Sequence, residues 1–128
     1  MSQSHAVISV PPGLISLPPL YLSRDEMVAF ARAFDPQPFH LDEDAAKDSL
    51  LGELVASAWY TCARITECVE AVNGNLGFAV QLAGVDQILL VAPVRPGDRL
   101  SGPIRIGALE HCACGETSCQ CRVDVENP

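Results

Sequence analysis

The segment that most restricts the fold is a long helical repeat near the middle of the chain. Between residues 52 and 72, apolar residues recur at steps of three and four, a spacing typical of one face of an α-helix about five turns long. The repeating residues are Leu54, Val55, Ala58, Trp59, Cys62, Ile65, Val69 and Val72. Small residues crowd its first half, so we expect a central helix closely surrounded by other backbone, with Trp59 in the core.

Strands are predicted after this helix. Residues 85–92 are rich in β-forming side chains, residues 93–98 carry a strong turn signal, and residues 99–109 and 119–126 alternate as two further strands. The chain thus predicts an α+β domain in which an antiparallel sheet packs on a buried helix.

Shorter elements are predicted before it. Residues 15–22 suit one strand in a proline-rich arm, and Ser23 with Glu26 forms a capping box for a helix of about three turns ending at Phe34. Asp42 is expected to cap a short acidic helix over residues 43–49.

Composition excludes several classes of protein. A chain of 128 residues with 48% hydrophobic and 19% charged residues is expected to form a single domain over residues 1–128. A net charge of −8 disfavours a nucleic-acid partner, which needs a basic surface. No apolar run approaches the ~20 residues of a membrane span, and no signal peptide precedes Pro11, so we expect a cytoplasmic protein with no membrane partner.

The loop after Phe34 places an acid and a histidine five residues apart. Asp35 and His40 are separated by a stretch that contains Pro36 and Pro38, which restrict the backbone and should hold the two side chains in a set geometry. Such a pair can hold one water and move its protons. An ordinary turn with a solvated histidine remains the alternative.

Three stretches of the chain together resemble one family. Residues 30–42 (FARAFDPQPFHLD) are similar to the hydratase signature of MaoC-like dehydratases, the (R)-specific enoyl-CoA hydratase group of the hotdog fold. Residues 52–59 (GELVASAW) resemble the start of that family's central helix, and residues 94–98 (VRPGD) resemble its turn between strands. The matches come in the expected order within residues 20–107.

The resemblance implies a site and a reaction. Asp35 and His40 would be the catalytic dyad that holds the water added across a trans-2-enoyl thioester, giving an (R)-3-hydroxyacyl thioester without a cofactor. The amide of Gly52, at the expected N-terminus of the central helix, would donate to the thioester carbonyl, as helix N-termini do for developing negative charge. A hotdog thioesterase and a non-catalytic acyl-CoA-binding or structural subunit remain the alternatives.

The same resemblance bears on partners and on the sheet. It implies a homodimer and an acyl-CoA substrate, preferred over an acyl-carrier protein because such carriers are acidic like this chain. Arg95, Arg99 and Arg105 are candidate contacts for CoA phosphates, with ordinary solvated arginines as the alternative. The last strand of the family's sheet is expected to be missing, so that the partner chain or the N-terminal arm would cover the exposed edge.

Four cysteines near the end of the chain form two Cys-x-Cys pairs. If Cys114 faces Cys119 across a hairpin, Cys112 faces Cys121 and all four sulfurs share one side of the sheet. Structural zinc sites usually use wider spacings, so we expect no metal here and favour small apolar side chains on a sheet face.

Overall fold

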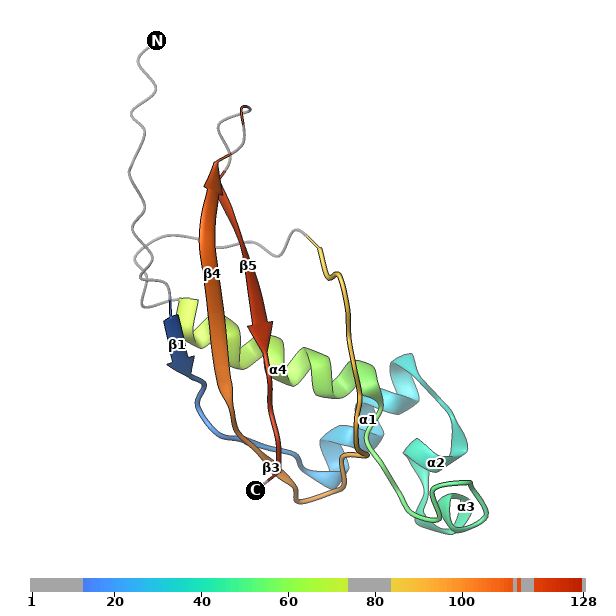
Figure 1. The fold of residues 1–128 in the computed structure, drawn as a ribbon. Helices are drawn as coiled ribbons and strands as arrows, with labels where there is room; N and C mark the ends of the chain where they lie inside the picture. Colours follow the sequence, from blue (N-terminus) through green and yellow to red (C-terminus); the bar gives the residue numbers. More distant parts are fainter. Residues whose placement is uncertain (1–12, 74–83, 112, 114–116, 128) are drawn as a thin grey trace.

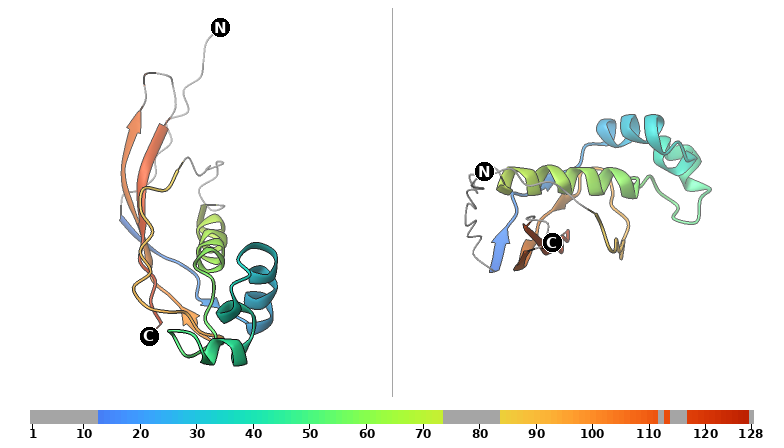
Figure 2. Two further views of the ribbon diagram at one scale, coloured as in Figure 1. Left: turned by 90° about the vertical axis from the view of Figure 1, so that its right-hand side faces the viewer. Right: turned by 90° about the horizontal axis from the view of Figure 1, so that it is seen from above.

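The computed structural model describes residues 13–73, 84–111, 113 and 117–127. These residues form an α+β arrangement in which strands and helices occupy separate layers (Figures 1 and 2). The elements in chain order are β1 (Gly13–Ser16), β2 (Leu20–Tyr21), α1 (Arg24–Phe34), α2 (Pro38–Leu41), α3 (Glu43–Lys47), α4 (Ala58–Asn73), β3 (Arg99–Leu100), β4 (Pro103–His111) and β5 (Thr117–Val123).

The strands form two antiparallel sheets. One has the order β1-β4-β5, so the N-terminal arm supplies an edge strand for β4, and the other pairs β2 with β3. The long helix α4 lies against one face of the three-stranded sheet (Figure 2). Ile104 and Ile106 of β4 are buried there, with Cys68, Val69 and Val72 of α4 packed against the same cluster. The predicted sheet on a long helix is therefore confirmed.

Helix α1 forms as its sequence predicts. The Ser23 hydroxyl accepts a hydrogen bond from the Glu26 amide at 3.2 Å, which caps the first turn. Met27 and Ala31 are buried on the inner face. The helix ends at Phe34 because Asp35 precedes a proline and is held in a non-helical conformation.

Helix α4 begins later than predicted. It starts at Ala58, whereas the apolar repeat predicted a start at Gly52. The amides of Val55 and Ala56 donate to the carbonyls of Phe39 and Val94, at 3.3 and 2.7 Å, and these tertiary bonds hold residues before Ala58 in an extended path. The prediction that Trp59 lies in the core is also wrong, since its side chain is 63% exposed.

Three strand predictions need correction. Residues 15–22, expected to form one strand, are divided between β1 and β2, which belong to different sheets. Residues 85–92 form no strand in the described chain, and their apolar side chains are exposed. Residues 99–109 are divided between β3 and β4, which belong to different sheets. The break falls at Gly102, where a Cβ would collide with the backbone carbonyl of Asp124, so the chain can cross there only with glycine.

The expected alignment of the cysteines is wrong for the two that the structure describes. Cys119 pairs with Leu109 and Cys121 with Ile106, because β4 ends at His111 opposite Thr117 and carries an irregularity between Ile106 and Leu109. Cys112 and Cys114 lie outside the described residues. Within the described part of the chain, no group of three or more His, Cys, Asp or Glu side chains is arranged to hold a metal ion.

Among the described helices, none combines the length and the apolar character needed to cross a membrane.

Candidate active site

The structure brings Asp35 and His40 together at the N-terminal end of α4. Asp35 follows the last residue of α1, and His40 lies in the single turn of α2, which Pro38 begins. The His40 Nε2 atom is 3.3 Å from the Asp35 Oδ2 atom. The His40 side chain is 7% exposed and that of Asp35 is 19% exposed, so the pair is largely shielded yet reachable from solvent.

The contact of the second ring nitrogen of His40 determines its tautomer. Nδ1 lies 2.8 Å from the backbone carbonyl oxygen of Val55. A carbonyl oxygen can only accept, so we assign the proton to Nδ1. In the neutral ring, Nε2 then carries a lone pair, and this lone pair faces the carboxylate of Asp35.

Hydrogen bonds keep the Asp35 carboxyl ionised. Gln37 Nε2 donates to Oδ1 at 2.8 Å, and the Ser57 hydroxyl donates to Oδ2 at 2.7 Å. These two bonds, with a smaller contribution from His40, hold the pKa of Asp35 below its ordinary value of 3.8 against the opposing effect of desolvation. An ionised carboxylate oxygen and an imidazole nitrogen thus face each other across 3.3 Å.

Ser57 is a site residue that the sequence analysis did not identify. It is fully buried, and its carbonyl accepts the first hydrogen bond of α4, from the Thr61 amide at 3.1 Å. It therefore occupies the N-cap position, but its hydroxyl binds Asp35. A serine at the start of a helix is a recognisable signal, yet this one is hidden in sequence by the continuous apolar repeat.

Replacing Ser57 by alanine is expected to raise the pKa of Asp35 towards 3.8, because one of the two donors to its carboxylate is lost. A carboxyl whose pKa is lower in the folded than in the unfolded state stabilises the fold at pH values above its unfolded-state pKa. This stabilisation is lost as the pH falls through the folded-state pKa. The stability of Ser57→Ala should therefore depend less on pH below about 3.8. Carbon-13 NMR titration of the Asp35 carboxyl, with urea unfolding across the acid range, measures both effects. An unchanged carboxyl titration would contradict the assignment of the Ser57 bond.

Gly52 does not lie at the start of a helix. It is in the turn after α3 with a φ of +70°, and its amide donates to the Ser49 carbonyl at 3.1 Å. This corrects the predicted placement, and the reason is the extended path before Ala58 described above. The donor role of Gly52 stays a prediction, which the bond to Ser49 makes less favourable. The amides that α4 leaves without an intrahelical partner belong to its first turn, beginning at Ala58.

Two of the three arginines considered for phosphate contact, Arg95 and Arg99, are already engaged. Arg95 Nε lies 2.6 Å from Glu53 Oε1, so this surface ion pair also neutralises the acid next to Gly52. Arg99 lies over the ring of Tyr21, 5.6 Å from its centre. Arg105 is exposed on β4, opposite Leu14 and Arg122 in the neighbouring strands. The described contacts do not gather these three side chains around Asp35 and His40.

Comparison with known proteins gives the family. The model of the MaoC-like domain matches residues 13–120. A MaoC-like dehydratase from Rhodospirillum rubrum is 30% identical over 92% of this chain and 82% of its own, with a TM-score of 0.63. No curated protein gives a significant match by sequence.

Two further structures share the fold. The C-terminally truncated HadBC (3R-hydroxyacyl-ACP dehydratase) complex from Mycobacterium tuberculosis has a TM-score of 0.72 at 21% identity, covering 94% of this chain and 89% of that one. The (R)-hydratase of A. caviae involved in PHA biosynthesis has a TM-score of 0.57 at 20% identity, covering 94% and 98%. The predicted hotdog fold is confirmed by these likenesses, and the chain belongs to the family of MaoC-like dehydratase domains.

Proposed function

We propose that this chain hydrates a trans-2-enoyl thioester to the (R)-3-hydroxyacyl thioester and catalyses the reverse dehydration. The observation that carries the proposal is the 3.3 Å approach of a carboxylate oxygen, Asp35 Oδ2, to an imidazole nitrogen, His40 Nε2. Membership of a hydro-lyase family supports the reaction class. The substrate and the catalytic roles below are inferred from the geometry.

One water molecule can satisfy both acceptors at once. Where His40 is neutral, the two O–H bonds of this water would point to Asp35 Oδ2 and His40 Nε2, because both atoms then accept hydrogen bonds. The oxygen lone pairs of this water then point away from the pair, towards a bound alkene. The two side chains thereby orient the nucleophile before the reaction, which removes much of the entropic cost of bringing water and substrate together.

The lowered pKa of Asp35 separates the roles of the two groups. A carboxylate of depressed pKa is a weak base, so the water proton passes to His40 Nε2 while the oxygen bonds to the β-carbon. The imidazolium then returns a proton to the α-carbon, and the ring regains its starting state. The adjacent carboxylate stabilises the transient positive charge on His40. Protons and charge balance without another reactant.

The enolate oxygen formed between these steps needs a hydrogen-bond donor. The first turn of α4 offers backbone amides at the positive end of a 16-residue helix, next to Ser57 and hence next to Asp35. We assign this donor role to the Ala58 amide, in place of Gly52.

Ala58→Pro tests this donor directly. Proline is tolerated at the first position of a helix, where its missing N–H has no intrahelical acceptor, so the fold should be kept. We expect kcat to fall by about 10²–10³-fold, the usual effect of removing one such donor. Gly52→Ala is the comparison: its amide remains and a Cβ there meets open space, so activity should stay within a few-fold. Alanine is strained at a φ of +70°, so the activity of this variant is measured together with its thermal unfolding. Full activity in a folded Ala58→Pro protein would reject the assignment.

The proposed substrate is an acyl-CoA and the proposed assembly a homodimer. Arg95 and Arg99 are proposed to reach CoA phosphates, which would require Arg95 to leave Glu53. The exposed apolar side chains of residues 85–91 are proposed to meet a second copy of the chain; Leu89 and Val91 are 71% and 94% exposed.

The decisive experiment is hydration of a short trans-2-enoyl-CoA by protein of measured oligomeric state. Loss of the ultraviolet absorbance of the conjugated thioester, with chiral identification of an (R)-3-hydroxyacyl product, supports the proposal. Release of free thiol without hydration would indicate the thioesterase alternative. Binding of acyl-CoA with neither reaction would indicate a non-catalytic subunit.

A further inference from the structure

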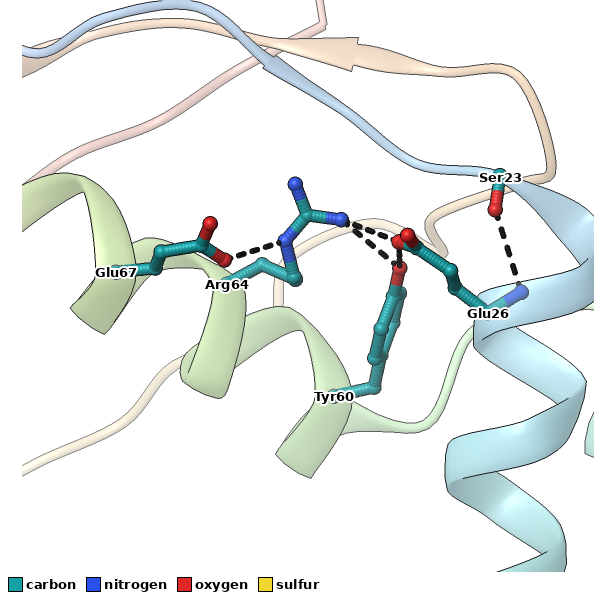
Figure 3. A network of polar contacts seen from close by, with 5 residues as sticks. All are labelled: Ser23, Glu26, Tyr60, Arg64 and Glu67. Atoms are coloured by element: carbon teal, nitrogen blue, oxygen red, sulfur yellow. Dashed lines mark hydrogen bonds and ion pairs between the residues drawn. The ribbon is translucent and has the colours of Figure 1, made fainter.

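A polar network joins α4 to α1 at a second point, in the first turn of α1 (Figure 3). The Tyr60 hydroxyl donates to Glu26 Oε2 at 3.0 Å, and Arg64 Nη1 donates to the same oxygen at 2.7 Å. Arg64 Nη1 also lies 3.2 Å from the Tyr60 hydroxyl oxygen. Three side chains from two helices thus close a small ring of contacts.

Each member of the network is itself held in place. The ring of Tyr60 is buried in the cluster that contains Leu22 and Met27, and its centre lies 5.5 Å from that of Phe30. The backbone of Glu26 is fixed by its hydrogen bond to Ser23, and its carboxylate turns to α4 (Figure 3). Arg64 is additionally paired with Glu67 one turn further along α4, at 3.0 Å. The contact therefore joins two ordered surfaces.

The two connections lie far apart along α1. Glu26 is in its first turn and Asp35 directly follows its last residue, a separation of nine residues, or about 13 Å along a helix axis. On α4 they are close, with Ser57 at the N-cap and Tyr60 and Arg64 in the next two turns. With the Asp35 connection alone, only the apolar packing of Met27 and Phe30 against Tyr60 would set the direction of α1 relative to α4, whereas the second polar connection adds a directional contact at its other end.

We propose that Glu26, Tyr60 and Arg64 are positioning residues, which hold α1 at the angle that directs the Asp35 carboxylate towards His40 and Ser57. Because Asp35 is carried by the end of α1 and His40 is bound to Val55 just before α4, a rotation of α1 changes the distance between them. The expected change in kcat rests on the proposed function. The expected change in the arrangement of Asp35 and His40 does not depend on it.

The kinetic test uses Tyr60→Phe and Arg64→Met, which keep the packing volume but remove the donors to Glu26. We expect the double variant to lower kcat about 10-fold, as small misplacements of catalytic groups do, while KM changes less than twofold. Glu67→Gln is the matched control: it removes the negative charge that pairs with Arg64 within α4 but leaves the connection to α1, so kcat should not change. Glu26→Gln keeps an acceptor for Tyr60 and should retain most of the wild-type kcat. Equal losses in the Glu67→Gln control, or a loss confined to KM, would overturn the proposal.

An NMR measurement separates this inference from the proposed function. Nitrogen-15 shifts of the His40 ring and carbon-13 shifts of the Asp35 carboxyl should both change in Tyr60→Phe/Arg64→Met and not in Glu67→Gln. If the wild type proves inactive but these shifts respond, the positioning role stands and the reaction assignment fails. If the shifts are unchanged in a folded double variant, the positioning role is rejected whatever the activity.

Discussion

His40→Asn is expected to lower kcat for enoyl-thioester hydration by about 10²–10⁴-fold, the usual contribution of a general acid–base group. The asparagine amide can still donate to the Val55 carbonyl, as His40 Nδ1 does, so the local fold should be kept. What is lost is Nε2, the atom that faces Asp35 and is proposed to receive and return the proton.

The measurement is the initial rate of loss of enoyl absorbance, with thermal unfolding as a check on the fold. His40→Ala removes the Val55 bond as well and serves as the comparison. If both variants lose the same activity, the loss belongs to Nε2. An active, folded His40→Asn protein would exclude the proposed proton transfer.

Asp35→Asn is expected to reduce kcat by a similar 10²–10⁴-fold for a different reason. The asparagine side chain is nearly the same size and can still accept from Gln37 or Ser57. Its amide nitrogen, however, can donate to His40 Nε2 and occupy the lone pair that should bind the water, and the negative charge that stabilises the imidazolium is gone.

The double variant gives the sharper result. If Asp35 and His40 act on one water as a unit, Asp35→Asn/His40→Asn should be little worse than either single variant, since groups that act together are strongly non-additive. Gln37→Ala is the control, because it removes one donor to Asp35 and leaves both acceptors in place. Multiplicative losses in the double variant would show two independent roles.

The helix ends around the site could be predicted from the sequence, because interactions between residues close in the chain determine them. Ser23 caps α1, Asp35 ends it before a proline, and Asp42 caps α3, as predicted. The two prolines between Asp35 and His40 likewise act through backbone restriction within a few residues. Short-range sterics and capping bonds need no information from elsewhere in the chain.

The start of α4 was predicted wrongly because periodicity cannot register long-range hydrogen bonds. The apolar repeat continues through residues 52–57, but Phe39 and Val94 bind the amides of Val55 and Ala56 and keep this stretch extended. These backbone hydrogen bonds also place the Val55 carbonyl oxygen next to His40 Nδ1. They leave Ser57 at the N-cap position of α4. An error of six residues in one helix start therefore placed Gly52 at the helix N-terminus, a position that Ala58 occupies in the structure.

By itself the sequence determined the α+β class, the two helices that flank the acid–histidine loop, and the two residues that we propose as the catalytic pair. Those features depend on spacing, capping and proline, which act over a few residues. Only the tertiary structure decided that His40 Nδ1 is committed to Val55, that Ser57 and Gln37 keep Asp35 ionised, and that α1 is fastened to α4 at Glu26. The contacts of His40, Ser57 and Glu26 join residues that are far apart in sequence and become neighbours through packing. Gln37 is only two residues from Asp35, but the direction of its side chain is set by the folded loop.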